Sequence, residues 1–497
     1  MCDTHIYEKG HWNDEIFNRC YVGPDDKEKK FFDIIKRDDV AAFEEYLRNS
    51  HCFTHHRKLP FVYAKTFDEG GTPWTVTVNL GSIGVLEALL KYEDYGDGDY
   101  REGWDRSQPM ATQWHRQILH RAIEKGQTKV FRYLIERPGA DIYQRDRGEG
   151  GTPITTACFA LGNCSGGDSM ALEAAVDKFE EIVVLLLDSG ASARDEYRQK
   201  AAYTEKHGQE VLVSTTLSLA ASRARPPLLR RLIEEGADAD TPVSSDWVDE
   251  EQDITLLHTA SRHHNVAAVK FLLDQPAGPA MARRRDGHQG MLPLHCAAAG
   301  LSPDHRHVMG RYGDAEVTSH AVETIQALLP YNEIHERRDC DGKTALHLAA
   351  EYFEKPFHGY DASCYDPVIR LLLDHGANAG ARADARNSEG NTPVHLAAGM
   401  NRFIPGGRDE TPEDIAARQQ CLGKRQQDIM QLLLKSLGES GAGIMDQPNK
   451  GGKSPRQIEE FRTSENQRRR EEEMERFRRE RIRDEIRLAS MTDDDAD

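Results

Sequence analysis

Short apolar segments alternate with polar turns along most of the chain, and their spacing indicates helices with one buried face. Apolar residues recur at i, i+3 and i+4 in segments that end at glycine or an equivalent turn residue. The clearest of these segments are 130–136, 182–190, 228–236, 269–274 and 368–376. The pattern predicts many short helices separated by tight turns.

A second motif precedes most of these helices and repeats along the chain. It is clearest as Thr-Ala-Leu-His-Leu-Ala-Ala at 344–350 and Thr-Pro-Val-His-Leu-Ala-Ala at 392–398. Weaker copies begin at residues 117, 152, 216, 255 and 292. Threonine can cap the first amides of a helix, proline is tolerated in its first turn, and alanine permits close helix packing. Each repeat is therefore predicted to be two short antiparallel helices.

These residues resemble the ankyrin repeat, in which Thr-Pro-Leu-His-x-Ala is followed by a leucine-rich helix and then Gly-Ala-Asp or Gly-Ala-Asn. The tripeptides at 139–141, 236–238 and 376–378 complete the resemblance, which is specific from about 117 to 434. It implies an all-α ankyrin-repeat solenoid, to which the sequence adds a charged C-terminal helix. It also implies that the histidines of the motif hydrogen-bond neighbouring turns and are not catalysts, namely His120, His258, His295, His347 and His395.

Changes of pattern divide the chain into five predicted segments. They are an N-terminal extension (1–30), degenerate ankyrin-like repeats (31–115), the main array with insertions (116–450), a C-terminal cap with the charged helix (451–490), and an acidic tail expected to be disordered (491–497). The charged run has many possible i, i+4 ion pairs, which indicates a solvated helix. Its apolar residues keep no steady heptad, which favours docking on the last repeat over a coiled coil.

The motifs lie farther apart than the roughly 33 residues of an unadorned ankyrin repeat. Between paired helices, the excess at 162–170, 301–318, 352–366 and 400–424 is predicted to form loops on one edge. Between repeats, the segments 195–210 and 240–253 resemble the hairpin-like fingers of ankyrin proteins. Such segments are either contact elements or tolerated surface loops, because closing a longer loop costs little entropy.

Acidic and aromatic residues occur together in two segments, and these are the candidate partner-binding residues. One segment contains Tyr100 and Trp104, and the other contains Asp246, Trp247, Asp249 and Glu250. An apolar anchor among carboxylates suits a protein partner with a basic surface. The alternative is that the tryptophans close the flank of the solenoid while the acids solvate their loops.

Charge and composition narrow the functional classes. With 64 basic and 83 acidic residues the net charge is -19, which opposes direct binding of nucleic acid. No apolar run approaches the roughly 20 residues that cross a bilayer, and the first residues lack a signal-peptide core. The nine cysteines form no CxxC pair and are interpreted as reduced thiols. An intracellular, cytoplasmic protein without a membrane partner is expected, and a nuclear one is possible.

Several short motifs suggest a catalytic, nucleotide-binding or metal site, but each lacks a residue or element that such a site requires. Gly-Lys-Thr at 342–344 and Gly-Lys-Ser at 452–454 lack the earlier glycine of a phosphate-binding loop. Gly-Asp-Ser-Met at 167–170 has no predicted strand before it, as a hydrolase nucleophile would require. The histidines and cysteine at 51–56 have no second ligand pair for zinc. No catalytic residue, cofactor or metal is predicted.

The sequence predicts a non-catalytic scaffold or adaptor that binds another protein. Two alternatives stay open because a fold does not fix a function. One is a regulatory adaptor in the nucleus, recruited by transcription or chromatin proteins. The other is an enzyme whose site is assembled from the insertions, which a converging acid/base cluster would favour.

Overall fold

The computed structural model describes most of the chain and shows it to be largely helical. The described residues are 33–49, 73–90, 118–137, 140–145, 151–164, 169–200, 210–240, 254–287, 289–299, 314–331, 340–352, 366–379, 383–400 and 411–493. The chain divides into two compact units, one of residues 1–161 and 174–212 and the other of residues 162–173 and 213–497. The predicted all-α repeat architecture is confirmed.

The first unit contains short paired helices. Residues 33–36 and 118–124 are helical, and the named helices are α3 (Val40–Asn49), α5 (Pro73–Leu80), α6 (Ile83–Leu90) and α8 (Thr128–Ile135). α9 (Pro153–Asn163) and α10 (Ser169–Asp188) each cross from one unit into the other along the sequence. β1 (Glu196–Lys200) pairs with β2 (Glu210–Thr215), so the finger expected near 195–210 begins and ends as a two-stranded sheet.

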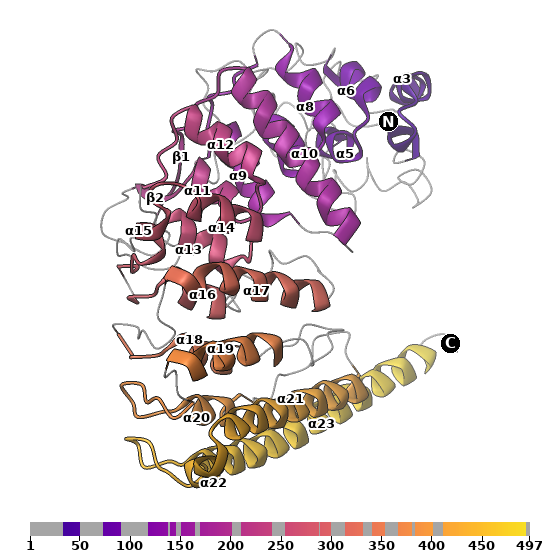
Figure 1. The fold of residues 1–497 in the computed structure, drawn as a ribbon. Coiled ribbons are helices and arrows are strands. Elements are labelled where there is room, and N and C mark those ends of the chain that lie inside the picture. Colours follow the sequence, from indigo (N-terminus) through magenta and orange to yellow (C-terminus); the bar gives the residue numbers. More distant parts are fainter. Residues whose placement is uncertain are drawn as a thin grey trace. The chain divides into compact units, whose positions relative to one another are not determined.

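The second unit is a stack of helix pairs (Figure 1). The pairs are α11 (Thr216–Ala221) with α12 (Pro226–Glu234), α13 (Leu256–Arg262) with α14 (Val266–Leu273), α16 (Pro293–Ala299) with α17 (Asp314–Leu328), α18 (Ala345–Tyr352) with α19 (Asp366–Ala379), and α20 (Pro393–Ala398) with α21 (Pro412–Ser436). Shorter elements are α15 (Gly278–Ala282), η5 (Leu329–Tyr331), η7 (Gly438–Ser440) and α22 (Gly441–Ile444). From α11 onward, each first helix packs on the first helix of the next pair.

Alanine and leucine are buried at different places in these helix pairs. Ala260, Ala297 and Ala349 are almost fully buried where the first helices stack, because only a small side chain lets two helix backbones approach closely. The second helices contribute larger side chains such as Leu229 and Leu272, both completely buried. Burial of such side chains supplies most of the stability of short helices, since isolated helices of this length are marginal in water.

The turn between paired helices needs a left-handed residue, which explains two unusual backbone angles. Gly81 and Gly126 have φ of 75° and 59°, and Asp38 and His264 take the same place with φ of 53° and 51°. The residue after this position bonds to the preceding repeat. Asn265 Nδ2 donates to the carbonyls of Ala221 and Ala224, both at 3.0 Å. These turns therefore lock successive repeats together along one edge.

The insertions between paired helices are partly helical, which corrects the expectation of loops. α10, α17 and α21 reach 20, 15 and 25 residues, so residues 169–170, 314–318 and 412–424 are helix. In α21 the hydroxyl of Thr411 caps the amide of Asp414 and Pro412 occupies the first turn. Ile415, Leu422 and Ile429 are buried at intervals of seven residues, which gives the added turns an apolar face.

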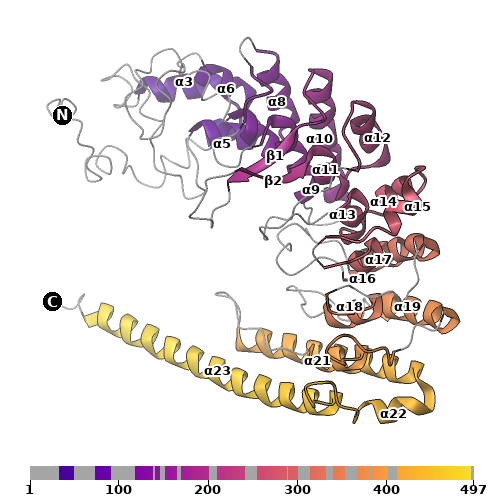
Figure 2. The ribbon, with the colours of Figure 1, turned by 90° about the vertical axis from the view of Figure 1, so that its left-hand side faces the viewer.

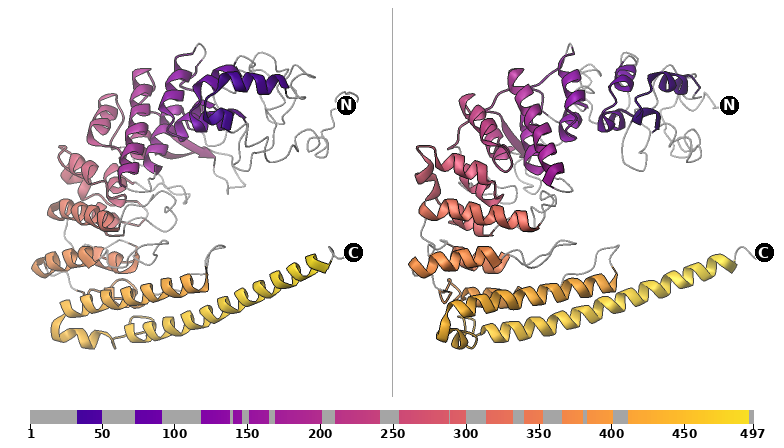
Figure 3. Two further views of the ribbon diagram at one scale, coloured as in Figure 1. Left: turned by 90° about the vertical axis from the view of Figure 1, so that its right-hand side faces the viewer. Right: turned by 45° about the vertical axis from the view of Figure 1, so that its right-hand side comes forward.

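The charged segment forms α23 (Pro455–Asp493), a helix of 39 residues and therefore about 58 Å long. It packs against α20 at its beginning and lies beside α21 in every view (Figures 2 and 3). Ion pairs at i, i+4 join Arg468 to Glu472 and Arg479 to Glu475 along its exposed surface. The predicted solvated helix docked on the last repeat is confirmed. Within the described part of the chain, none of the helices has the length and apolar character to span a membrane.

Candidate protein-interaction surface

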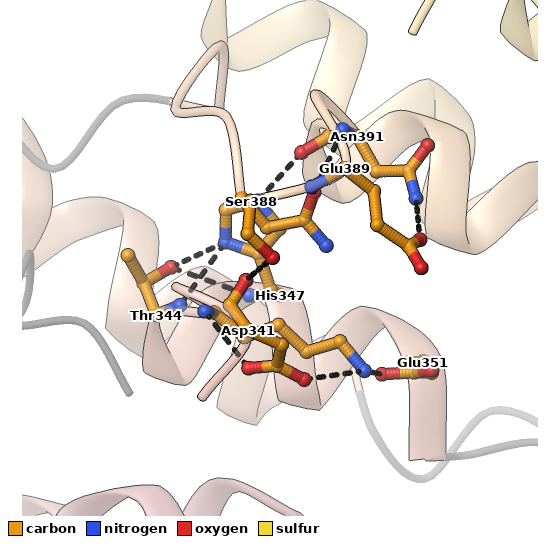
Figure 4. Close-up of polar contacts among 9 residues, drawn as sticks. Asp341, Thr344, His347, Glu351, Ser388, Glu389 and Asn391 are labelled. Atoms are coloured by element: carbon orange, nitrogen blue, oxygen red, sulfur yellow. Dashed lines mark hydrogen bonds and ion pairs between the residues drawn. The ribbon is translucent and has the colours of Figure 1, made fainter. Parts of the chain in front are cut away.

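One histidine in each clear repeat joins its own helix cap to the next turn. In α18, Nδ1 of His347 accepts from the backbone amide of Thr344 at 3.2 Å and contacts the Thr344 hydroxyl at 2.8 Å. Nε2 of the same ring lies 3.0 Å from the carbonyl of Asn391 in the next turn (Figure 4). Because a carbonyl can only accept, Nε2 carries a proton, and because Nδ1 accepts the amide of Thr344, Nδ1 carries none. The imidazole is therefore neutral.

The same arrangement recurs along the array. Nε2 of His258 donates to the Met291 carbonyl at 2.9 Å, and Nε2 of His395 donates to the Gln447 carbonyl at 3.0 Å. In the first unit, Nε2 of His120 donates to the Gln144 carbonyl at 3.1 Å. His295 also accepts from the backbone amide at the start of its helix, that of Leu292. The structural role expected for these histidines is confirmed.

Burial fixes the protonation of these rings. It lowers the pKa of His258 to about 4, against weaker raising effects from its bond to Met291 and from Asp286. Burial also lowers the pKa of His395. Both ring nitrogens of His258, His347 and His395 already have partners. These imidazoles therefore lack a nitrogen that could serve a reacting group.

The turns before successive first helices stack through backbone hydrogen bonds. The amide of Ser388 donates to the carbonyl of Asp341 at 2.8 Å, and the amide of Lys450 donates to the carbonyl of Glu389 at 2.9 Å. Within a turn, Oδ1 of Asn387 accepts from the amides of Glu389 and Asn391. A Cβ on Gly390, whose φ is 77°, would lie 3.0 Å from the amide nitrogen of Lys450. Glycine is thus required both for the turn and for its stacking.

The Gly-Lys-Thr tripeptide at 342–344 belongs to one of these turns. Lys343 forms ion pairs with Asp341 and with Glu351, the two carboxylates labelled in Figure 4. Only 13% of the Lys343 side chain is exposed. Its ammonium group is committed within the repeat rather than held toward a phosphate. In the last turn Lys453 instead lies over the ring of Phe461, 5.5 Å from the ring centroid. Both tripeptides are repeat turns, as their position before a helix indicates.

Arg386 joins the last two turns by hydrogen bonds, a contact that the sequence analysis does not predict. Nη1 of Arg386 donates to the carbonyls of Gly390 and Pro448 at 2.8 and 3.1 Å, and Nη2 donates to Oε1 of Gln447 at 2.9 Å. Arg285 makes the equivalent bond to the carbonyl of Gly290. The only sign of this contact in the sequence is an arginine four or five residues before the turn glycine. The sequence does not indicate that its partner lies 62 residues away.

The six candidate partner-binding residues lie outside the described residues. They are Tyr100, Trp104, Asp246, Trp247, Asp249 and Glu250. The histidines and cysteine at 51–56 lie outside them as well. Of the expected fingers, the ends of 195–210 are described: Tyr197 in β1 is buried and stacks on Phe159 with ring centroids 5.9 Å apart. The base of this finger is thereby fixed to α9.

The described residues do not form a metal site or a catalytic site from the other motifs of the sequence. They contain no group of three or more histidine, cysteine, aspartate or glutamate side chains that could hold a metal ion. Ser169, from the Gly-Asp-Ser-Met motif, is simply the first residue of α10. Burial raises the pKa of the Cys158 thiol to about 12, so this cysteine is held in its unreactive protonated form.

Comparisons with known proteins agree with this architecture. The family described as "Ankyrin repeats (3 copies)" matches residues 217–308 and 315–404, and "Ankyrin repeat" matches residues 116–147. The matched residues of this chain are ankyrin repeats, a kind of repeat that generally mediates protein–protein interaction.

Among solved structures, the human ASB11 ankyrin repeat domain is similar to this chain. The two are 20% identical, the match covers 61% of this chain and 98% of that one, and the TM-score is 0.35. The comparison with curated proteins found no match.

Proposed function

We propose that the protein is a cytoplasmic, non-catalytic scaffold that holds a folded partner against its repeat array. The observation that supports this most directly is the commitment of polar groups in the repeats to one another. Histidines, turn amides and Lys343 all bond within or between neighbouring repeats. A surface fixed in this way loses little conformational entropy on binding, which favours a stoichiometric binder.

Three successive repeats supply the longest additions between paired helices. The connections from α16 to α17, α18 to α19 and α20 to α21 each span more than ten residues, whereas α13 and α14 are joined by a three-residue turn. Repeats stacked in register carry such additions on the same edge. We propose that this edge and the segment 240–253 together contact the partner. The acidic residues of that segment and the net charge of -19 favour a partner with a basic surface.

Affinity capture from native lysate, combined with localisation of the protein, tests this proposal. The test variant carries Trp247→Ala with Asp246→Asn, Asp249→Asn and Glu250→Gln. The control variant carries Glu234→Gln, Glu413→Gln and Glu439→Gln, exposed positions that remove the same charge. A partner retained by the control and lost by the test variant supports the scaffold and its contact segment.

The other outcomes are informative in different ways. A partner retained by both variants contradicts the assignment of the contact to 240–253. Variants of Tyr100 and Trp104 then test the second acidic segment. If no protein is captured by any form, the scaffold proposal is wrong. Detection of the protein mainly in nuclei would contradict the cytoplasmic assignment and favour the nuclear adaptor.

A further inference from the structure

Successive first helices in the second unit meet in a constant register. The residue four positions after the histidine faces the next repeat, and the residue just after the histidine faces the previous one. Arg262 Nη2 accordingly lies 3.9 Å from Sγ of Cys296, which follows His295. Ala299 packs in a cluster with Leu348, and a Cβ on Gly399 would lie 3.8 Å from Ile458. This register identifies what the last repeat presents outward.

The beginning of α23 is the first helix of a final repeat, with glutamine in place of histidine. Ser454 takes the cap position, and its amide donates to Oε1 of Gln457 at 3.0 Å, as the cap amide of an upstream repeat donates to Nδ1 of histidine. The side-chain Nε2 of Gln457 thus takes the place of the imidazole Nε2 that elsewhere donates to the next turn. Gln457 is exposed, and no described residue accepts from this group.

The turn before α23 leaves one acceptor in the same register. Gly452, with φ of 73°, matches Gly342 and Gly390, so Gly451 matches Asp341 and Glu389. The carbonyls of Asp341 and Glu389 each accept an amide of the following turn, whereas that of Gly451 accepts no backbone amide from the described residues. The last turn therefore ends the backbone ladder with an open acceptor.

Phe461 lies on this outward face, four residues after Gln457. It is 57% exposed. The cations of Lys453 and Arg462 lie 5.5 and 5.8 Å from its ring centroid. Lys450 and Lys453 are exposed on either side of Gly451, and neither pairs with a carboxylate of the described residues. This face therefore combines hydrogen-bonding groups that the described residues leave unused, an exposed apolar side chain and positive charge.

We propose that this face, defined by Lys450, Gly451, Lys453, Gln457 and Phe461, binds an acidic extended segment of a partner protein. An amide of the segment donates to the Gly451 carbonyl, and one of its carbonyls accepts from Gln457, which continues the ladder of the repeats. An apolar side chain of the segment packs on Phe461, and its carboxylates pair with the two lysines. The inference adds a second contact to the proposed scaffold and rests on that function.

Selection from a random 16-residue phage-displayed peptide library against the full chain tests this assignment. We expect selected peptides to carry at least two carboxylates near an apolar residue. Synthetic peptides are then measured by calorimetry against a test variant, Lys450→Glu, Lys453→Glu and Phe461→Ala. The control, Lys424→Glu, Lys435→Glu and Ile482→Ala, makes the same change of charge and truncates another exposed apolar side chain, at positions in α21 and in the distal part of α23.

Binding that the test variant weakens at least tenfold, that the control preserves, and that salt weakens supports the proposal. Failure to enrich acidic peptides overturns it, as does equal binding by both variants. Thermal unfolding of each variant verifies that the array remains folded. The Trp247 variant distinguishes failure of this proposal from failure of the scaffold proposal. If a captured partner is lost with Trp247→Ala and no acidic peptide binds, the scaffold proposal is supported and only the proposed peptide-binding face is wrong.

Discussion

At the scale of single residues, the histidine of the repeat is the most constrained side chain. His347 is fully buried and bridges its own cap to Asn391. His347→Ala removes both bonds and leaves a buried carbonyl and amide without that partner, which is expected to cost about 2–4 kcal/mol of unfolding free energy. Urea unfolding measures the change. His375→Ala, at an exposed position, is the control and is expected to have little effect.

Glutamine is expected to rescue part of that loss. Gln457 shows that a glutamine oxygen can replace Nδ1 at the cap. His347→Gln is therefore expected to retain the cap and to be more stable than His347→Ala by about 1 kcal/mol. Equal stability of the two variants would contradict the view that the cap contributes separately from the bond to Asn391.

The neutral histidines predict a pH dependence of stability. Burial holds the pKa values of His258 and His264 at about 4, below the 6.5 of an unfolded histidine. Between these values the unfolded chain binds protons that the folded chain does not, so stability decreases as the pH falls from about 6.5 to 4. Each ring accounts for up to about 3 kcal/mol of this loss. Urea unfolding at pH 7.5, 6 and 5 measures it.

A variant isolates the contribution of one ring. His258→Gln keeps an amide that can reach the cap and the Met291 carbonyl but has no group that titrates in this range. Between pH 6.5 and 5 this variant is expected to lose less unfolding free energy than the unchanged chain. The difference corresponds to the uptake of about one proton fewer on unfolding. An unchanged slope would show that His258 is not buried in its neutral form.

At the scale of elements, the two parts of α23 have different roles. Its first turns pack on α20, and Asn466 and Glu473 are buried, whereas Ile482 is 56% exposed. We expect deletion of residues 481–497 to leave the stability of the repeats unchanged. Deletion of 454–497 exposes the repeat formed by α20 and α21 and should accelerate amide exchange in these two helices most strongly. Similar exchange in both truncated forms would contradict the capping role.

At the scale of the whole molecule, stability is distributed among neighbouring repeats. Because each repeat packs mainly on its neighbours, a cavity in one destabilises the array locally. Leu272→Ala, at a completely buried position of α14, is expected to cost about 2–5 kcal/mol. Hydrogen exchange should increase most in α13, α14 and the adjoining pairs, and less in α21. A uniform increase throughout the second unit would instead indicate one cooperative block.

The repeat pairs were predictable because their signals are local. Thr392, Pro393 and His395 specify a cap, a first turn and a buried ring within four residues, and the structure places all three as the motif implies. The sequence does not predict the full length of α21, although its start signal is equally local. Thr411, Pro412 and Asp414 form a complete start signal, but the spacing of the repeats made the segment look like excess loop.

Local signals in the amino-acid sequence are sufficient to predict the class of fold, the first helices of the clear repeats, most of the second helices and the structural use of the histidines. These follow from periodicity and capping, which act over a few residues. The stacking of the repeats in three dimensions shows which carbonyl each imidazole reaches, that Arg386 joins two turns, and that Gly451, Gln457 and Phe461 share an open face. Such relations join residues separated by a whole repeat, and they depend on the stacking register, which the spacing of residues along the chain does not specify.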